Sequence, residues 1–295
     1  MGFEQCHPAV NFIYFATVLF GTFTFRHPVF LLISFLCAFA YSVKRNGVRA
    51  IIFNGALLPI IGLFALYYAS YTHFGVTVLA QNRVGNDITL ESLVYGVVLG
   101  TVAAGAIMWF SCIFSVFSSD KTVYLFGKIS PRLSLFLSIL LRMIPRIKTE
   151  AKRINTAQQG IGKGANQGNV LRRLRNAIRI FSILITWTVD ALTRASESMQ
   201  SRGSSLRGRK SFSLYRFDHR DRAYVIGMFA CITLVMMSVL LGQTDMIYDP
   251  RILFPPITSF SLLFYAGYAA LCLMPLGLEL YTEYRFRKAV KRIET

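Results

Sequence analysis

The sequence predicts an all-α polytopic membrane protein with about six transmembrane helices and long amphipathic helices on the cytoplasmic side. Hydrophobic residues make up 54% of the 295 residues and charged residues only 16%, against about 25% charged in a typical soluble domain. A soluble fold could not bury so much apolar surface. The 32 Lys and Arg residues also outnumber the 14 Asp and Glu residues, and most of this excess falls in one stretch.

Six apolar segments are candidates for membrane spans, at residues 9–25, 28–43, 48–71, 90–118, 223–241 and 257–281. A span needs about 20 residues, because each residue of a helix rises about 1.5 Å. The last four segments meet this length. The first two are short and are separated only by Arg26 and His27, so they could form a hairpin that does not fully cross. The pairs His7-Pro8 and His27-Pro28 predict the starts of these two helices.

A strongly basic stretch covers residues 142–222, where 18 Lys and Arg residues face five acidic residues, a net charge of +13 in 81 residues. Two apolar runs within or beside it, at residues 133–147 and 178–192, are too short to span a membrane. Because basic residues interrupt and flank both runs, they predict long amphipathic helices that lie at or below the membrane surface.

Proline and glycine positions predict the ends of these two helices. Pro131 suits the start of the first helix, Pro145 is expected to bend it, and the glycines within residues 160–164 end it. The second helix is expected to cover residues 169–200 and to stop at Gly203.

The positive-inside rule sets the expected topology. Basic residues place three parts of the chain in the cytoplasm, namely residues 44–49, 142–222 and 285–292, whereas the loops 73–89 and 242–256 are expected outside. Six crossings then leave both termini in the cytoplasm. The expected organisation is N-terminal transmembrane helices (1–119), a cytoplasmic helical region (120–221), and C-terminal transmembrane helices with a basic tail (222–295).

Several absences argue against enzymatic and nucleic-acid functions. The glycine-rich stretch around Lys163 lacks the phosphate-binding GxxxxGK[ST] pattern, because Gly164 follows the lysine and no strand precedes it. The histidines and cysteines lack metal-ligand spacing, and no pair of intramembrane carboxylates suggests acid–base chemistry. The basic residues alternate with Leu, Ile and Trp187 at helical spacing instead of gathering with exposed aromatic residues. We therefore expect no catalytic residue, metal, cofactor or nucleic-acid partner.

The most informative motif ends the second amphipathic helix. Ala195 and Met199 lie one turn apart on that helix, which then closes with Ser201-Arg202-Gly203. A guanidinium on the last turn can donate two parallel hydrogen bonds to a carboxylate, or hydrogen bonds to carbonyl oxygens, of a docked protein. It can equally interact with its own helix end and with lipid phosphates. The residues alone leave these two interpretations open.

The chain resembles the transmembrane T component of energy-coupling factor (ECF) transporters, the EcfT/CbiQ family. The resemblance covers nearly the whole chain and includes the His7-Pro8 start and the segment Leu-Leu-Arg-Met-Ile-Pro-Arg at residues 140–146. The family carries an Ala-Arg-Gly-type tripeptide at the end of each of two coupling helices. Ser201-Arg202-Gly203 matches the second tripeptide well.

The first tripeptide is degenerate in this chain. It aligns, after Gln158, with Gly160-Ile161-Gly162, which keeps the glycine and lacks the arginine. This departure puts an ionic anchor at the first site in doubt, and Lys163, one residue further on, could replace the missing charge.

The resemblance implies a non-catalytic scaffold in a bacterial or archaeal cell membrane. In the family, the T component docks its coupling helices onto two ABC-type ATPase subunits, A and A′, and holds a substrate-binding S component among the membrane lipids. Movement driven by ATP then passes through the coupling helices, and the S component releases a vitamin or metal ion inside the cell. The resemblance does not identify the substrate, because in this family the S component selects it.

Two other classes remain as alternatives. A stand-alone secondary transporter or channel would need paired intramembrane charges or broken helices at the midplane, and the predicted spans are nearly free of charge. A membrane enzyme acting on lipid would need clustered acid–base or metal-binding residues near the interface, for which His7, His27 and Asp120 are only scattered candidates. Glu279, near the inner end of the last span, is expected to extend towards the membrane surface.

Overall fold

A computed structural model describes residues 2–72, 74–81, 87–203, 215, 217–255 and 258–294. Some predicted features therefore lie outside the described residues, namely parts of the two outer loops (73, 82–86 and 256) and residues 204–214 of the basic stretch. The chain divides into two compact units. We call Met1–Ser118 with Tyr215–Thr295 the membrane unit, and Ser119–Leu214 the helical insert.

The described part of the membrane unit consists mainly of helices α1 (Pro8–Thr24), α2 (Pro28–Asn46), α3 (Val48–Tyr71), α4 (Leu90–Val116), α8 (His219–Leu240) and α9 (Ser259–Glu294). A 3₁₀ turn, η1 (Phe3–Gln5), precedes them, and a hairpin of β1 (Val78–Gln81) and β2 (Asp87–Thr89) lies between α3 and α4. All of these helices except α1 are long and apolar enough to cross a membrane. The predicted all-α polytopic membrane class is confirmed.

Two predicted spans differ in length from the sequence-based boundaries. The second one extends to Asn46 as a helix of 19 residues, which meets the length of a span, whereas α1 has only 17 residues. The last helix does not stop at residue 281 but continues through the basic tail to Glu294.

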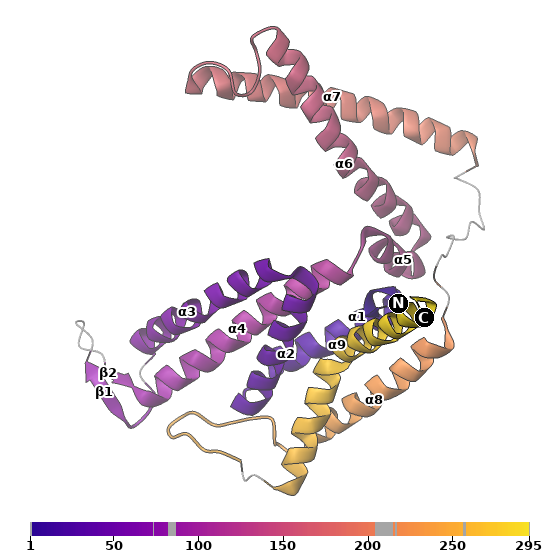
Figure 1. Cartoon of the computed structure of the whole chain (residues 1–295). Helices are drawn as coiled ribbons and strands as arrows, with labels where there is room; N and C mark the ends of the chain where they lie inside the picture. The colour runs from indigo at the N-terminus through magenta and orange to yellow at the C-terminus, as the bar shows by residue number, and fades with distance from the viewer. Residues whose placement is uncertain are drawn as a thin grey trace. The chain divides into compact units, whose positions relative to one another are not determined.

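Successive helices of the membrane unit run in alternating directions (Figure 1). Their ends therefore form two opposite faces. The hairpin end carries β1, β2 and the segment from Gly242 to Pro255, and the basic end carries Lys44, Arg45 and the start of α8.

The two His-Pro pairs start helices as predicted. His7 and His27 are the N-cap residues of α1 and α2, and each is followed by proline at the first helical position. The Nδ1 atom of His7 accepts a hydrogen bond from the backbone N–H of Ala9 at 3.2 Å, and that of His27 accepts one from Val29 at 3.3 Å. The imidazoles thus satisfy N–H groups that the helices leave free.

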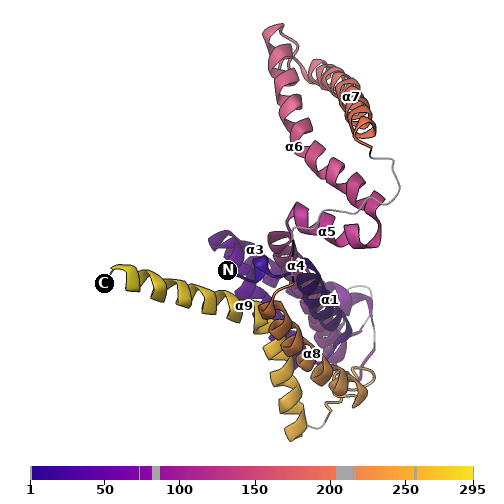
Figure 2. The same cartoon turned by 90° about the vertical axis from the view of Figure 1, so that its right-hand side faces the viewer.

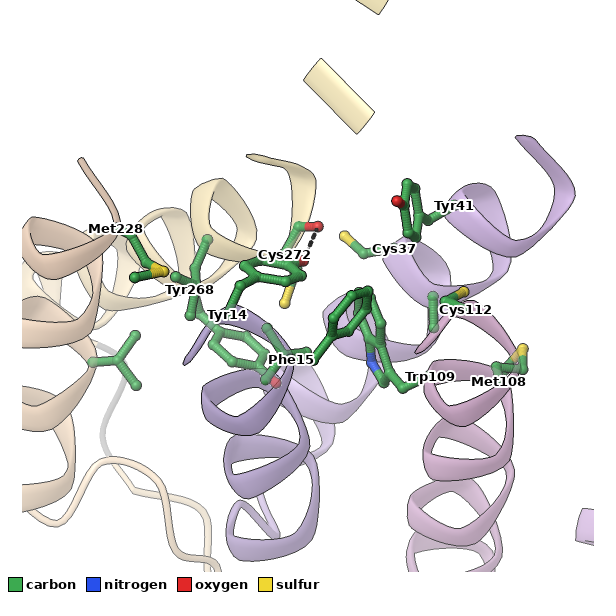
Figure 3. Close-up of a cluster of buried hydrophobic side chains, with 14 of the residues drawn as sticks. Tyr14, Phe15, Cys37, Tyr41, Met108, Trp109, Cys112, Met228, Tyr268 and Cys272 are labelled. Atoms are coloured by element: carbon green, nitrogen blue, oxygen red, sulfur yellow. Dashed lines mark hydrogen bonds between the residues drawn. The ribbon is translucent and has the colours of Figure 1, made fainter. Parts of the chain in front are cut away.

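Aromatic rings fill the centre of the membrane unit (Figure 3). Tyr14 and Trp109 are fully buried, and Phe15 lies edge-on to both, with ring centroids 5.2 and 6.4 Å away. The Tyr14 hydroxyl donates to the carbonyl oxygen of Cys272 on α9 at 3.0 Å, and the Trp109 indole N–H donates to Ser34 Oγ on α2 at 3.0 Å. Both polar groups are therefore paired within the apolar interior, as buried aromatic donors normally are.

Glycines bring α3 and α4 into close contact. A Cβ atom added at Gly96 would lie 2.9 Å from the Cα atom of Ala65, and one at Gly100 would lie 3.0 Å from the Ile61 side chain. Since no side chain fits there, the backbones approach directly, as in other small-residue helix interfaces within membranes.

The hairpin between α3 and α4 was not predicted from the sequence. Its strands are antiparallel, with Val78 opposite Thr89 and Gln81 opposite Asp87. Glu91, in the first turn of α4, accepts hydrogen bonds from the hydroxyl and the backbone N–H of Thr77. This carboxylate therefore ties the start of the hairpin to the start of the helix.

A loop from the α8–α9 connection closes against the same end. The backbone N–H of His27 donates to the carbonyl oxygen of Thr244 at 3.1 Å, and the Tyr248 hydroxyl donates to the carbonyl oxygen of Arg26 at 2.7 Å. Burial raises the pKa of Tyr248 to about 12, and the adjacent Tyr95 adds to this shift. The α1–α2 turn is thus covered by ordered chain.

Ion pairs join distant segments at the basic end. Arg45 contacts Glu4 at 2.8 Å and Glu279 at 3.5 Å, and Lys44 contacts Glu283 at 2.6 Å. The Tyr41 hydroxyl donates to Glu279 Oε1 at 3.4 Å. Glu279 is only 8% exposed. It therefore lies among these partners and does not extend to the membrane surface as the sequence suggested.

Pro275 lies inside α9, and the helix changes direction near it (Figure 2). The part before the proline runs alongside α8 in the bundle, whereas the part after it leaves the bundle sideways. Proline removes a backbone hydrogen bond and collides with the preceding turn, which is the usual cause of such a kink. We call residues 276–294 the arm.

The helical insert contains α5 (Ser119–Ile129), α6 (Pro131–Gly160) and α7 (Val170–Ser201). The last two are the predicted amphipathic helices, with boundaries within two residues of those expected. Helix α6 continues through Pro145. Helix α5 was missed, because its 11 residues begin with four polar side chains followed by an apolar run at residues 123–126 and are too few to show a helical repeat.

Candidate functional site

The candidate site consists of the two long helices of the insert and the tips that end them. One basic side chain links the helices, since the guanidinium of Arg146 on α6 lies over the ring of Trp187 on α7, 5.4 Å from its centroid. Such a cation–π contact stabilises the crossing while keeping the charge near water.

Each long helix leaves an apolar stripe uncovered within the insert. On α7 the stripe repeats every three to four residues, and its members are 41–81% exposed: Leu171, Leu174, Ile178, Phe181, Ile185, Val189 and Leu192. Helix α6 has a shorter stripe of Leu133, Phe136, Leu140 and Ile144. Arginines occupy other faces of α7, which makes the helix strongly amphipathic. These stripes are suited to burial against other apolar surfaces.

The first tip closes α6 with a Schellman motif. Gly162 adopts a positive φ of 68°, and its N–H donates to the carbonyl oxygen of Gln159 at 3.0 Å. The N–H of Lys163 donates to the carbonyl oxygen of Gln158 at 2.9 Å. These bonds fix Ile161 as the C-cap residue, and its side chain is 63% exposed.

Side-chain amides hold the turn that follows the first tip. Asn155 on α6 accepts a hydrogen bond from the N–H of Ala165 at 3.0 Å, and Asn176 on α7 donates to the carbonyl oxygen of Gly164 at 3.1 Å. Gln167 accepts from the N–H of Gly164 at 3.0 Å. The glycine-rich stretch is therefore an ordered connection between the two helices.

The second tip closes α7 at the predicted place. Gly203 has a φ of 76°, and its N–H donates to the carbonyl oxygen of Gln200 at 2.9 Å. The Ser201 hydroxyl donates to the carbonyl oxygen of Ser198 at 3.0 Å, and Arg202 is the exposed C-cap residue. A cation at this position interacts favourably with the negative end of the helix dipole and still faces outward.

Ala195 and Met199, the remaining residues of the predicted second motif, lie one turn apart on α7. Both are partly buried, whereas their neighbours Glu197 and Ser201 are exposed. They therefore form the apolar side of the helix end that carries Arg202.

Comparison with known proteins identifies relatives of one kind. The chain is 29% identical over 113 residues to the energy-coupling factor transporter transmembrane protein EcfT of Streptococcus thermophilus, and 31% identical over 113 residues to that of Lactococcus lactis. These matches cover 37% of this chain and 42% and 39% of the relatives, so they span about two fifths of those proteins. A third EcfT, from Lactobacillus helveticus, is 25% identical over 223 residues, which are 68% of this chain and 76% of the relative.

The resemblance to EcfT is confirmed. No protein-family model matches the chain. The names of the relatives identify them as transmembrane proteins of energy-coupling factor transporters. The chain is thus a multi-pass membrane protein similar to a transporter subunit.

The sequence located both tips but could not show how closely their backbones correspond. The helix ends follow from glycine positions, whereas the hydrogen bonds from Gly162 and Lys163 depend on three-dimensional closure of the turn. Sequence reasoning also missed Asn155 and Asn176, which anchor that turn. Their signal was weak, since a polar amide within a basic amphipathic helix is usually part of the solvated face.

Proposed function

We propose that this chain is the T component of an ECF-type importer, the membrane subunit that transmits ATPase motion to a substrate-binding S component. The observation that carries this proposal is the pair of long helices closed by equivalent tips, at the two positions where the family has its tripeptides. Similarity to three EcfT proteins supports it. The ATPases and the S component are separate chains in this proposal.

The tips are the proposed contacts with the two ATPase subunits. Arg202 offers a planar guanidinium at the end of a 32-residue helix, and such a group binds carboxylates with two parallel hydrogen bonds. A continuous α-helix transmits displacement along its axis because its backbone hydrogen bonds resist bending. A push at one tip therefore moves the rest of the helix. The net positive charge of the insert favours an acidic groove as its partner.

The apolar stripes of α6 and α7 are the proposed contacts with the membrane-embedded part of the complex. In this arrangement the stripe of α7 faces the S component or the membrane helices, and Arg202 at the tip faces an ATPase subunit. The substrate class, a vitamin or a metal ion, is then determined by the S component.

The proposed orientation follows from charge. The basic end of the membrane unit, the arm and the insert face the cytoplasm, since Lys and Arg concentrate on that side of membrane proteins. Both termini then lie in the cytoplasm of a bacterial or archaeal cell. Cysteine accessibility from outside tests this: a cysteine introduced at Gln81 should react with an impermeant maleimide, and one at Gln200 should not.

The decisive experiment is co-purification of the full chain with the ABC-type ATPases of the same organism. Arg202→Glu should reduce ATPase recovery at least tenfold and abolish substrate uptake, while membrane insertion stays unchanged. Arg194→Glu is the matched control, since it makes the same charge reversal at an exposed position of α7 two turns away. Full ATPase recovery and uptake with Arg202→Glu would contradict the proposal.

The alternative of a stand-alone transporter makes a different prediction. Vesicles containing only this chain would then accumulate a substrate without ATPases. The ring-filled centre of the membrane unit argues against a route through it, because Tyr14, Phe15 and Trp109 occupy that space.

A further inference from the structure

A cleft lies at the basic end of the membrane unit, between the arm, the first turns of α8 and the N-terminal segment. Its volume is about 390 Å³. Residues on one face of the arm line it, at positions 278, 281, 282, 285, 286 and 289, which are spaced three to four residues apart. On α8 it is lined by Arg220 and Tyr224, which lie one turn apart.

The opposite side of the arm is already occupied. Glu279 and Glu283 pair with Arg45 and Lys44 of α2. These contacts use the two acidic side chains of this part of the arm and fix its rotation. The face that lines the cleft therefore carries basic and apolar side chains and no carboxylate.

The lining of the cleft is amphipathic. Leu278, Tyr224 and Tyr281 supply apolar surface, and Arg220 and Arg285 supply positive charge. Arg220 lies in the first turn of α8 and Tyr224 one turn deeper, so the charge is nearer the water. A ligand with a phosphate at the level of the arginines and an acyl chain along the aromatic rings would match this arrangement of charge and apolar surface.

A buried hydroxyl in the wall also lacks a partner. Tyr224 is 8% exposed, and its ring lies 5.6 Å from that of Phe3. Its hydroxyl has no hydrogen-bond partner among the described residues. Because the hydroxyl oxygen is itself fully buried, Tyr224 contributes its ring and not its hydroxyl to the wall of the cleft.

We propose that this cleft binds an anionic phospholipid, with its phosphate on Arg220 and Arg285 and an acyl chain along Leu278 and the ring of Tyr281. The arm then lies along the membrane surface beside the bound lipid. The exposed side chains of Tyr284 (64%) and Phe286 (70%) fit the same location, because aromatic residues favour the interface between lipid and water.

A lipid fits this cleft better than an acidic segment of another protein. The cleft begins where the apolar part of α8 ends, which is the depth of lipid headgroups, and most of its lining is apolar. An acidic peptide would place its backbone against rings that offer few hydrogen bonds.

The test uses the purified full chain, stripped of lipid in detergent and then supplied with phosphatidylglycerol or with phosphatidylcholine of the same acyl chains. Native mass spectrometry counts bound lipid, and thermal unfolding reports stabilisation. We expect phosphatidylglycerol to bind about tenfold more tightly than phosphatidylcholine, the ratio that one charge-assisted contact typically supplies. Only phosphatidylglycerol should raise the unfolding temperature.

Two variants locate the binding. Arg220→Gln combined with Arg285→Gln should abolish the preference for phosphatidylglycerol while leaving helix content unchanged. Arg287→Gln is the matched control. It also removes a charge from the arm, but Arg287 lines the neighbouring cavity around the ion pairs and not the proposed lipid-binding cleft. Because each substitution is conservative, loss of binding can be separated from loss of folding by circular dichroism.

Two results would overturn the proposal. One is equal binding of the two lipids, or an undiminished preference in the double variant. The other is a double variant that keeps its lipid but no longer co-purifies with the ATPases, which would make the cleft a protein contact. The first result does not depend on whether the chain acts as a T component, since lipid binding is measured without any partner.

Discussion

Ile161 and Arg202 occupy the same position at the ends of α6 and α7. Each is a C-cap residue with similar backbone angles (φ −104°, ψ 19° and φ −84°, ψ 9°), and each is followed by a glycine with positive φ. The degenerate first tripeptide therefore has the same backbone as the second tip and carries an apolar side chain at the C-cap position. A partner at the first tip would meet the exposed apolar side chain of Ile161 instead of a guanidinium.

The first prediction concerns the charge missing from the first tip. If Lys163 supplies it, Lys163→Gln should weaken ATPase association in the same direction as loss of Arg202, and Ile161→Arg in that background should restore it. Affinity measured by co-purification or surface plasmon resonance checks this. An unaltered affinity in Lys163→Gln would mean that the first tip docks through Ile161 without a charge.

The second prediction concerns the glycine that closes α6. Gly162→Ala forces a side chain into a positive φ and should lower stability by about 1 kcal/mol. Gly160→Ala provides the control, since a Cβ there meets no atom within 4 Å and alanine favours a helix over glycine. Thermal unfolding of the two purified variants should therefore shift in opposite directions.

The third prediction concerns the contact between α3 and α4. Gly96→Ala places a Cβ 2.9 Å from the backbone of Ala65, so the helices must separate, and we expect a loss of about 1–3 kcal/mol. Gly62→Ala on α3 meets no atom within 4 Å and should be neutral. Equal unfolding temperatures for the two variants would show that the helices are not closely packed.

The fourth prediction concerns the ion pairs at the basic end. Arg45→Ala leaves Glu279 buried without its guanidinium partner, and breaking a buried pair in this way typically removes about 3 kcal/mol. Adding Glu279→Gln should recover part of the loss, because the unpaired charge is gone. The exposed Arg49→Ala serves as control. Chemical or thermal unfolding of these proteins and of Glu279→Gln alone measures the coupling between Arg45 and Glu279.

The fifth prediction is a dependence of stability on pH. Burial lowers the pKa of His27, and its neutral Nδ1 accepts the hydrogen bond that caps α2. The unfolded chain therefore binds a proton more readily than the folded one. The stabilisation is fully present above the unfolded pKa of about 6.5 and decreases as the pH falls below it.

Asparagine also caps helices but does not titrate, so it isolates the contribution of His27. Between pH 7.5 and 5.5, the unfolding temperature of the natural chain should fall more than that of His27→Asn. Parallel curves for the two proteins would contradict this explanation.

The membrane helices could be predicted because their signal is local. Long apolar segments indicate where α3 and α4 lie, the His-Pro pairs indicate where α1 and α2 begin, and glycines indicate where α6 and α7 end. Neighbouring residues carry each of these signals. The positions of the two tips could be predicted for the same reason, since a glycine near the end of a helical pattern indicates a C-cap.

Contacts between distant parts of the chain could not be predicted. Arg45 and Glu279 are separated by 234 positions, and nothing in either neighbourhood shows that they meet. The cleft between α8 and the arm depends on the direction that α9 takes after Pro275, which the sequence marks only as a possible kink. The strands of the β1–β2 hairpin have only four and three residues, which is too short to show a clear alternation of apolar and polar side chains.

Pro275 also determines how deeply the last helix can sit in the bilayer. A straight helix of 36 residues would be about 54 Å long, well above the roughly 30 Å thickness of the hydrocarbon layer. The kink divides this length, so the charged part needs no tilt and no local thickening of the lipid to stay in water. Without Pro275, a straightened α9 would carry its basic residues away from the headgroups. The proposed lipid-binding cleft beside α8 would then lose the side that the arm provides.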